Sequence, residues 1–518
     1  MSGRSVPVAI VGGGPTGVTA ATLLAQHGVE CLVLDRWHDV YPQPRAVHID
    51  DEVFRIIAQL GLREDFAAIS RPALGLRLLD PRMRVLAQFH RGTTGVHGFP
   101  TANMFDQPDL ERMLRANLRR HGCVELRGGV DVVAIAQPDG GPVQVDYLDR
   151  ERGVRETVTA EYVLGCDGAN SMVRAAVGAR MEDLHFEQRW LVVDVATAQD
   201  LGAWEGVHQV CDPRRAATFM RIGDTRYRWE FRLHDGERAA DFADMRTLHP
   251  LIAPWTSGVR IEELQVVRVA EYTFRAQLAD RWRDRRVFLL GDAAHLTPPF
   301  IGQGLCAGMR DAHNLAWKLA AVLDGAMPAH VLDSYERERK PHVRALIRLA
   351  VGIGWAMTRG GETGNALRAL VAPRLHLIPG MRAKILDSTT PPLRASALTA
   401  RAPHRRLCGR LCPNAVVDGD RRFDDVAGNR VALVSATPLT ADQRTAVERR
   451  GAVVVTAHAG TDLHRWLRRG LATAALVRPD RTVMHSGRDL DRLVAAIPPL
   501  RAPANAQRAA LAVQSSRA

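Results

Sequence analysis

The chain has 518 residues, 46% of them hydrophobic, so it is long enough for roughly two to four domains with sizeable cores. Its 69 Lys and Arg residues exceed its 57 Asp and Glu residues by 12 and are spread along the chain, which favours an anionic ligand and argues against a nucleic-acid-binding arm. The seven scattered cysteines and the absence of an apolar run of about 18 residues argue against a disulfide framework and a membrane partner, so we expect a cytoplasmic protein. We also expect no metal site, because Cys408 and Cys412 have no second pair that would complete a tetrahedral set.

The N-terminal segment has the pattern of a dinucleotide-binding unit. Its parts are, in order, an apolar strand over 8–11, the glycines Gly12, Gly14 and Gly17, a helix over 18–27, and a strand ending at Asp35. Gly12 permits a tight turn, Gly14 lets the backbone approach a pyrophosphate, and Gly17 lets helix and strand pack closely. The helix N-terminus offers free N–H groups to phosphates, and Asp35 is placed to accept a hydrogen bond from a ribose.

The hydrophobic pattern of the residues that follow, up to about 148, predicts helices and short strands. We expect short strands within 74–100, helices over 50–60 and 108–118, and a hairpin over 130–148. An apolar strand over 160–165 then runs into Asp167 and Gly168, which by themselves are also typical of an ordinary turn.

Residues 181–275 change to an alternating pattern that predicts a second domain built on an antiparallel sheet. A hairpin is expected from 218–222 and 225–233. On its second arm, Arg226, Arg228, Glu230 and Arg232 share one face, and Tyr227, Trp229 and Phe231 share the other. The arginines either bind a substrate carboxylate or form a solvated face, and the aromatic residues are either core or pocket wall.

A third glycine motif follows a buried strand over 286–290. Gly291 and Asp292 end this strand, and a loop with Pro299, Gly302, Gln303 and Gly304 leads into a helix over 305–323. Residues 334–390 are helical in pattern, with Pro341, Pro373 and Pro379 as interruptions, and a boundary is expected around 391–413. Apolar strands over 431–434, 452–455 and 474–477 then predict a small α/β domain.

Together the three motifs resemble those of the single-component FAD-dependent aromatic hydroxylases. In that family the first motif binds the ADP half of FAD, the Asp-Gly motif supports FAD and the nicotinamide donor, and the Gly-Asp motif binds the ribityl chain. The family more often has Glu at the position of Asp35. The resemblance implies FAD contacts at Gly12, Gly14, Pro15, Thr16, Gly17, Asp35, Arg36, Arg45, Gln107, Asp167, Gly291, Asp292, Pro299, Gly302, Gln303 and Gly304.

The resemblance also implies a fold and its domains. We expect an α/β protein with a Rossmann-like FAD-binding domain of the glutathione-reductase type, an antiparallel β-sheet substrate domain and a C-terminal thioredoxin-like domain. The expected ranges are 1–75, 101–180 and 276–340 for the FAD domain, 76–100 and 181–275 for the substrate domain, 341–400 for a helical connection, and 401–518 for the C-terminal domain. That last domain has no C-x-x-C, so a structural role or a role in forming a homodimer is favoured.

Segments 45–52, 227–231 and 302–311 look like those of the 3-(3-hydroxyphenyl)propionate hydroxylases. This implies a monooxygenase that uses NADH or NADPH and O2 to hydroxylate a phenolic acid ortho to its hydroxyl, with 3-(3-hydroxyphenyl)propionate and 3-hydroxycinnamate converted to 2,3-dihydroxy products. His48 is the candidate catalytic base, with packing as its alternative role, and Arg226, Arg228, Tyr227 and Trp229 are candidate substrate residues. Three alternatives remain: hydroxylation of another phenol or a polyketide, a non-hydroxylating FAD-dependent oxidoreductase, and a non-catalytic FAD-binding protein.

Overall fold

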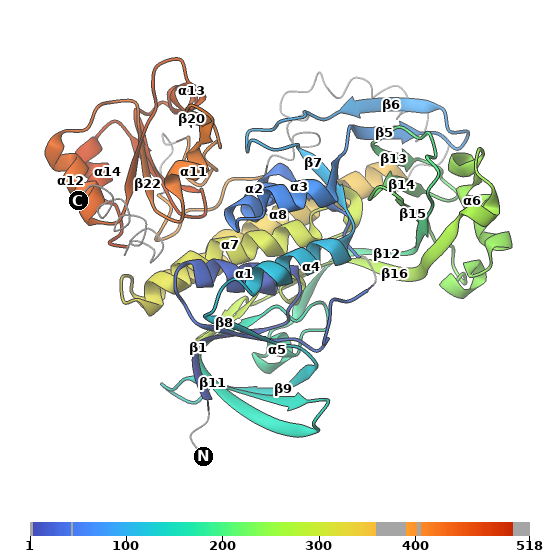
Figure 1. Ribbon diagram of the computed structural model, residues 1–518, viewed down its shortest axis with the longest axis horizontal. Helices are drawn as coiled ribbons and strands as arrows, with labels where there is room; N and C mark the ends of the chain where they lie inside the picture. The colour runs from blue at the N-terminus through green and yellow to red at the C-terminus, as the bar shows by residue number, and fades with distance from the viewer. Residues whose placement is uncertain (1–3, 43–44, 359–389, 401–405, 501–518) are drawn as a thin grey trace.

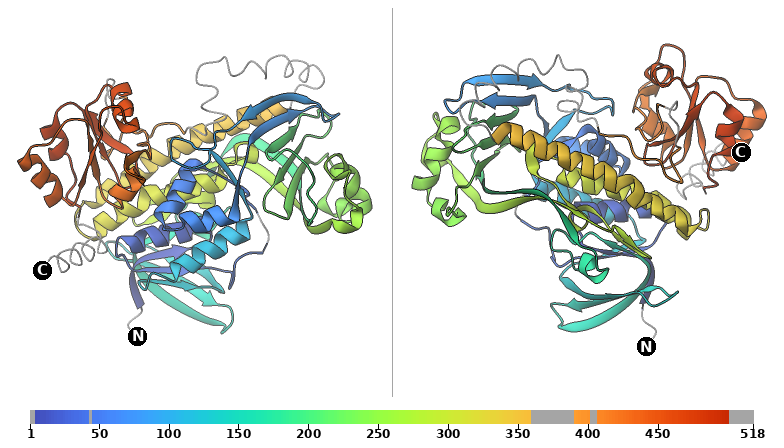
Figure 2. Two further views of the ribbon diagram at one scale, coloured as in Figure 1. Left: turned by 45° about the horizontal axis from the view of Figure 1, so that its top comes forward. Right: turned by 180° about the vertical axis from the view of Figure 1, so that it is seen from behind.

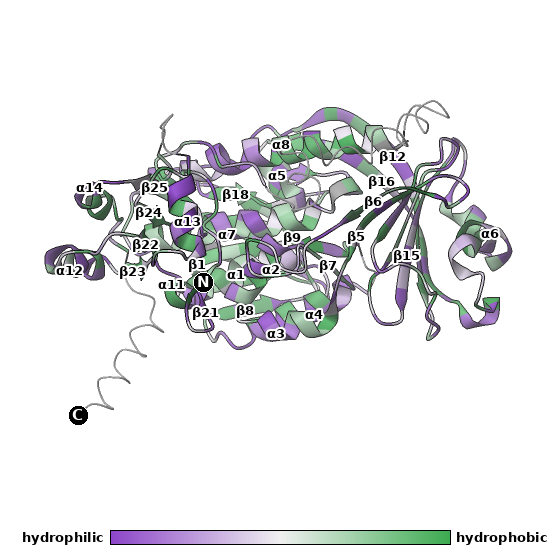
Figure 3. Ribbon diagram, turned by 90° about the horizontal axis from the view of Figure 1, so that it is seen from above, coloured by the Kyte–Doolittle hydropathy of each residue, from purple (hydrophilic) through white to green (hydrophobic). Residues whose placement is uncertain are grey.

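The computed structural model describes residues 4–42, 45–358, 390–400 and 406–500. The chain forms three parts (Figure 1). A central sheet and its helices lie in the middle, the C-terminal part lies at one end, and a second sheet covered by helix α6 (Met245–Thr256) lies at the other (Figures 1 and 3).

The central sheet is mostly parallel. Its strands in spatial order are β17 (Arg283–Asp284), β18 (Val287–Leu289), β11 (Val154–Gly165), β1 (Arg4–Val11), β2 (Cys31–Leu34) and β8 (Val124–Arg127). The hairpin of β9 (Val130–Ala136) and β10 (Val143–Asp149) extends it through β11. The inner strands are apolar and buried on both faces, as a parallel sheet covered by helices requires. The expected strands and hairpin are confirmed, whereas β8 was not predicted.

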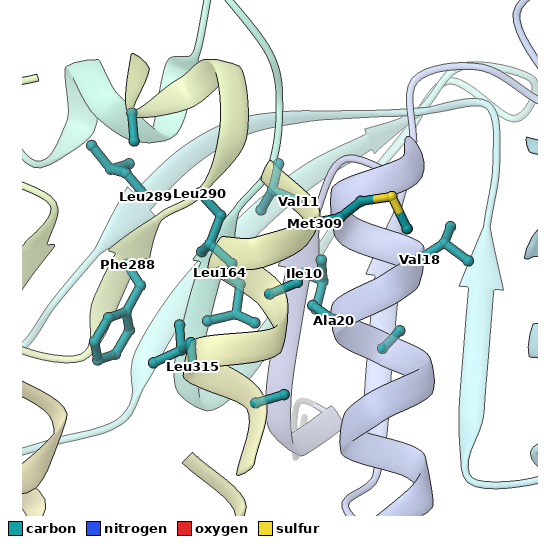
Figure 4. Packing of buried hydrophobic residues seen from close by; sticks show 14 of the residues in the cluster. Ile10, Val11, Val18, Ala20, Leu164, Phe288, Leu289, Leu290, Met309 and Leu315 are labelled. Carbon is teal, nitrogen blue, oxygen red and sulfur yellow. The ribbon is translucent and has the colours of Figure 1, made fainter. Parts of the chain in front are cut away.

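Helices α1 (Pro15–Gln26) and α7 (Gly304–Leu323) pack over this sheet and against each other (Figure 4). Val18 on α1 and Met309 and Leu315 on α7 meet Ile10 of β1 and Leu164 of β11 in one apolar cluster. Helix α4 (Gln107–Leu118) packs beside α1. The packing places the N-termini of α1 and α7 near the same edge of the sheet (Figure 1).

The second sheet is largely antiparallel, as predicted. Its strands in spatial order are β19 (His295–Leu296), β16 (Gln265–Ala279), β12 (Met181–Ala196), β15 (Arg226–Arg232), β14 (Ala217–Arg221), β13 (Val207–Val210), β5 (Gly75–Leu79) and β6 (Val85–His90). The β14–β15 hairpin confirms the expected one. Tyr227, Trp229 and Phe231 pack with Leu248 and Ile252 of α6, so α6 covers one face of the sheet and the other face turns toward the central domain.

Smaller elements connect the two sheets. They are β3 (His48–Asp50), β7 (Ala102–Phe105) and β4 (Ser70–Pro72), which pair in that order, with α2 (Asp51–Gln59), α3 (Arg63–Ile69) and α5 (Met172–Ala176). The helix expected over 50–60 corresponds to α2, which Asp50 caps by accepting a hydrogen bond from Val53 N at 2.9 Å.

Helix α8 (Asp333–Thr358) corrects one prediction, because it runs through Pro341 without a break (Figure 2). Tyr335, Val343 and Ile347 are buried in the central core, and this packing offsets the one backbone hydrogen bond that proline removes. The predicted domain boundary at 340/341 therefore falls inside a helix. Pro373 and Pro379 lie outside the described residues.

The C-terminal part has its own sheet, in the order β23 (Val453–Thr456), β22 (Ala432–Ser435), β24 (Ala474–Val477) and β25 (Val483–Gly487). β22 is parallel to β23 and antiparallel to β24. The remaining elements are the small hairpin β20 (Val416–Asp418) and β21 (Arg421–Arg422) and the helices α11 (Phe423–Ala427), α12 (Ala441–Arg449), α13 (Asp462–Arg469) and α14 (Leu490–Ala495). The three predicted strands are confirmed, and β25 was not predicted.

Candidate active site

A cavity of about 430 Å³ lies between the central sheet and the open face of the second sheet. The turns that follow β1, β11 and β18 line one end, and side chains of β12, β13, β14 and β15 line the other. Ligands of parallel sheets bind at the carboxyl ends of the strands, which is where the first end of this cavity is formed.

The glycine turn after β1 forms part of that end. Gly12 has φ +105°, and a Cβ on Gly17 would lie 2.0 Å from the carbonyl oxygen of Gly12, so both positions need glycine for the turn itself. Gly14 is different: it lines the cavity with Pro15 and Thr16, and a Cβ on it would meet no protein atom within 4 Å. No side chain caps the N-terminus of α1, so its first N–H groups are available to an anion.

Asp35 and Arg36 do not line the cavity. The carboxylate of Asp35 accepts hydrogen bonds from the backbone N–H of Gly13 and, at 2.7 Å, from that of Trp37. The Arg36 side chain is 67% exposed and lies 3.8 Å from Asp131. Asp35 therefore fixes the glycine turn, and the structure does not bring Arg36 to the cavity.

Gly291 and Asp292 form a turn that buried charges hold in place. Gly291 has φ +59°, and its N–H donates to Asp311 Oδ2 at 3.0 Å. Asp311 in turn pairs with His295 and Arg339, each at 2.8 Å. Asp292 lines the cavity, and burial raises the pKa of its carboxyl, which makes it a hydrogen-bonding group in a dry environment.

The loop before α7 presents its backbone to the cavity. Pro299, Gly302, Gln303 and Gly304 all line it. The side chain of Gln303 is held from both ends: its Nε2 donates to Asp50 Oδ2 at 2.9 Å, and its Oε1 accepts from Arg310 Nη1 at 2.7 Å. Arg310 also pairs with Asp50, so a buried polar triad fixes this loop. A Cβ on Gly304 would meet nothing within 4 Å, which leaves the N-terminus of α7 open.

Arg45 and Gln107 come together, as the resemblance implied. Gln107 Oε1 accepts hydrogen bonds from the backbone N–H groups of Arg45, at 3.0 Å, and Ala46, at 2.5 Å. Both Arg45 and Gln107 line the cavity. The Asp167 carboxylate accepts from Ser171 Oγ at 2.5 Å and Val173 N at 3.0 Å and does not line the cavity, although its neighbour Gly168 does.

His48 lines the cavity beside the Gly302 turn. Burial, assisted by the charge of Arg91, lowers the pKa of His48 to about 4, so the ring is neutral at pH 7. Arg91 Nη1 lies 3.1 Å from His48 Nε2 and can only donate, so Nε2 accepts and the ring proton is on Nδ1. The lone pair that a general base would use is therefore already occupied.

The open face of the second sheet builds the other end of the cavity. Strand pairing sets two rows of side chains across it. One row contains Val192, Glu230, Thr218 and Gln209. The next contains Asp194, Arg228 and Met220, and Val207 packs against the cluster that includes Met220. Trp190, Phe274 and Phe300 add aromatic walls.

Arg228 is buried and already paired. It forms two hydrogen bonds to Asp194, at 2.6 and 2.9 Å, and its Nη1 donates to the carbonyl oxygen of Arg45 at 2.8 Å. Arg228 therefore does not lie on a solvated strand face, which was one of the two alternatives for the arginines. Because these hydrogen bonds engage its guanidinium, it also has little capacity left to bind a substrate carboxylate. Arg226 lies 3.4 Å from Asp106 and does not line the cavity.

Tyr227 and Trp229 correct a second prediction. Both are buried in the core between the sheet and α6, and neither lines the cavity. Residues alternate between the two faces of a strand, so these two point away from the face that carries Arg228 and Glu230. Tyr227 and Trp229 therefore belong to the core and not to the wall of the cavity. Sequence reasoning missed Glu230 as a site residue, although the alternation that grouped it with Arg228 was a usable signal.

The cavity fits FAD: open glycines at Gly14 and Gly304, two exposed helix N-termini and the carboxyl of Asp292 all face it.

In the described part of the chain, no group of three or more His, Cys, Asp or Glu side chains could hold a metal ion. No described helix is long and apolar enough to cross a membrane.

Fold and cavity define an FAD-binding oxidoreductase, and comparison with known proteins agrees. A family model described as "FAD binding domain" matches residues 5–350. A probable NADH-specific resorcinol 4-hydroxylase of Rhodococcus jostii (strain RHA1) is 34% identical, with 96% of each chain covered. A 3-(3-hydroxy-phenyl)propionate/3-hydroxycinnamic acid hydroxylase of Burkholderia vietnamiensis (strain G4 / LMG 22486) is also 34% identical, covering 82% of this chain and 78% of that protein.

Solved structures share the fold. The flavin-dependent monooxygenase PieE superposes with a TM-score of 0.79 at 22% identity, covering 95% of this chain and 98% of that one. Aklavinone-11 hydroxylase superposes with a TM-score of 0.78 at 24% identity, covering 96% and 100%. The chain belongs to the family of FAD-dependent aromatic hydroxylases, and its cofactor is FAD.

Proposed function

We propose that this protein uses NADH or NADPH and O2 to hydroxylate a phenol that carries a polar substituent meta to its hydroxyl, at a ring carbon ortho to that hydroxyl. The observation that carries the proposal is that one continuous cavity joins the cofactor turns at one end to an apolar pocket with a few polar side chains at the other.

The names of two relatives support a substrate with a polar substituent meta to its hydroxyl. One is named for resorcinol, a phenol with a second hydroxyl in the meta position, and its named position, C4, lies next to a hydroxyl. The other is named for 3-(3-hydroxyphenyl)propionate, whose side chain is meta to the hydroxyl. The phenolic acid predicted from the sequence and a resorcinol-type phenol are therefore the two candidate substrates. The NADH in the first name makes NADH the preferred donor in this proposal.

When bound, FAD would relay reducing equivalents from the nicotinamide donor to O2 and transfer one oxygen atom to the ring. The chain's own residues bind it, exclude water and orient the ring. The open N-terminus of α7 favours negative charge on the cofactor by about 0.3–2 kcal/mol. Trp190, Phe274 and Phe300 keep the pocket dry. His48 can take a phenol proton only if Arg91 releases Nε2, so we expect His48 mainly to support the Gly302 turn.

The test is NADH and NADPH oxidation with and without resorcinol, 3-(3-hydroxyphenyl)propionate and 3-hydroxycinnamate, followed by identification of the product. Oxidation stimulated by a phenol with formation of an ortho-dihydroxy product supports the proposal. Oxidation without any hydroxylated product would instead support the alternative of a non-hydroxylating oxidoreductase. No oxidation at all would support a non-catalytic FAD-binding protein.

We also infer a Rossmann-like FAD domain from the parallel order β11-β1-β2-β8 with the glycine turn after β1. The C-terminal part runs β22-α12-β23-α13-β24-β25-α14 with the sheet order β23-β22-β24-β25, and this arrangement supports a thioredoxin-like domain. The predicted domain ranges, the homodimer and the cytoplasmic location stay predictions.

A further inference from the structure

Glu230 is the acid in the substrate end of the cavity that the proposed reaction has not used. It lies near the middle of β15, lines the cavity and is 9% exposed. Among the described residues, its carboxyl makes no hydrogen bond and no ion pair, whereas Asp194 on the neighbouring strand is paired with Arg228 through both oxygens. A buried polar group without a protein partner is costly, and a ligand that supplies the partner removes the cost.

Thr218 and Gln209 form a row of polar side chains next to Glu230, which we call the polar strip, and apolar side chains such as Val192 lie beside it. Val192 and Thr218 lie directly opposite Glu230 on the flanking strands, and Gln209 lies beyond Thr218. Thr218 Oγ1 donates to Gln209 Oε1 at 3.1 Å, and Gln209 Nε2 donates to the carbonyl oxygen of Ala217 at 3.1 Å. The donors of this strip are therefore already directed elsewhere. A ligand in this part of the cavity therefore meets hydrogen-bond acceptors, and the carboxyl of Glu230 is the strongest of them.

The charges beside Glu230 favour an uncharged ligand at this position. Arg228 and Arg268 lie on either side of Asp194 across the sheet, and Glu230 is two residues along β15 from Arg228. Arg228 is the arginine nearest to Glu230 along the strand, and Asp194 already engages it through two hydrogen bonds. A substrate carboxylate beside Glu230 would place two acids next to each other, whereas a hydroxyl would donate to Glu230 without adding a charge.

We propose that Glu230 accepts a hydrogen bond from the meta hydroxyl of an uncharged substrate, so that the protein selects a dihydroxyphenol over a phenolic carboxylate. This proposal rests on the proposed function and narrows it to one substrate class. It assigns Glu230 to specificity, because the residue contacts the part of the ring that is not hydroxylated.

The test compares the FAD-loaded wild type with Glu230→Gln and Glu230→Asp on three ligands: resorcinol, 3-methoxyphenol and 3-(3-hydroxyphenyl)propionate. 3-Methoxyphenol keeps the ring and one hydroxyl but cannot donate from the meta position. The ligand dissociation constant is measured from the change in flavin absorbance, and kcat/KM from product formation. Glu271→Gln is the matched control, since Glu271 is a partly exposed acid that pairs with Arg189 on β12 of the same sheet and does not line the cavity.

We expect the wild type to prefer resorcinol to both other ligands. Glu230→Gln should weaken resorcinol binding relative to 3-methoxyphenol by about 10- to 100-fold, as expected for a hydrogen bond to a charged group. The same change should not weaken binding of the acid, FAD content should stay unchanged, and Glu230→Asp should recover part of the preference. Glu271→Gln should match the wild type.

Two results overturn the proposal: a wild type that binds the phenolic acid more tightly than resorcinol, or a Glu230→Gln variant with an unchanged preference. The dissociation constants test the role of Glu230 separately from the proposed hydroxylation reaction, which product formation tests. Resorcinol binding that depends on Glu230 without hydroxylated product would overturn only the proposed function, and turnover of phenols that is indifferent to Glu230 would overturn only the inference.

Discussion

Arg55 on α2 and Asp424 on α11 form a two-bond ion pair, with both N–O distances 2.6 Å, although 369 positions separate them in the sequence. The two side chains are 3% and 11% exposed. The pair therefore joins the C-terminal part to a helix whose N-cap, Asp50, also holds the loop at Gln303. The contact therefore predicts that the C-terminal part supports the loop at Gln303 and, through it, cofactor binding.

We predict that Arg55→Met lowers the free energy of unfolding by about 3–5 kcal/mol, because it leaves Asp424 buried with less compensation. Arg63→Met is the control: Arg63 and Asp425 form an exposed pair at 2.9 Å, for which we expect about 0–1 kcal/mol. Urea denaturation of the two variants gives the comparison. Equal effects for both variants would contradict a structural role for the Arg55–Asp424 pair.

We predict that Gly14→Val folds but does not retain FAD, whereas Gly17→Val does not fold normally. A side chain on Gly14 meets open cavity, while one on Gly17 collides with the carbonyl oxygen of Gly12. Circular dichroism and thermal melting report the fold, and absorbance of the purified protein reports bound FAD. A folded Gly14→Val protein with stoichiometric FAD would rule out the assignment of this turn to the cofactor.

We predict that Arg228→Met lowers both the free energy of unfolding and FAD retention. The substitution leaves the buried Asp194 without its ion-pair partner and removes the hydrogen bond to the carbonyl oxygen of Arg45. The double variant Arg228→Met/Asp194→Leu should recover stability but not FAD retention, since only the unpaired charge is removed. Arg226→Met, which breaks a longer and partly exposed contact, is the control and should resemble the wild type. If the double variant regains FAD as well, the bond to Arg45 is not what supports the cofactor.

We predict that Asp51→Asn stabilises the protein more at pH 8 than at pH 5. Burial, with the nearby charges of Asp50 and Glu52, raises the pKa of Asp51 from 3.8 to about 8. Between these values the unfolded chain releases a proton that the folded chain keeps, so wild-type stability falls as pH rises through this window. Asparagine cannot ionise and avoids the loss, which is of the order of 1–4 kcal/mol at neutral pH.

Denaturation midpoints of the wild type and Asp51→Asn at several pH values test this prediction. Asp65→Asn, on the exposed face of α3, should show no such pH dependence. A stability difference between Asp51→Asn and the wild type that stays constant from pH 5 to pH 8 would show that Asp51 does not titrate in this range.

The sequence by itself determined the parts of the site that are local. A strand, a glycine turn and a helix N-terminus follow one another within a few residues, so the turns at Gly14, Gly291 and Gly304 could be identified from spacing and strand patterning alone. The same holds for the β14–β15 hairpin, where alternation correctly grouped Arg228 with Glu230 and Tyr227 with Trp229.

Only the tertiary structure decided which of those two faces lines the cavity. Alternation divides a strand into two faces but contains no information about what covers each, and here α6 covers the aromatic face and leaves Glu230 to the cavity. It likewise decided that Arg228 is paired with Asp194, on a strand 34 positions away. Such partners are set by the packing of distant segments, and burial then makes their charges interact strongly enough to fix the site.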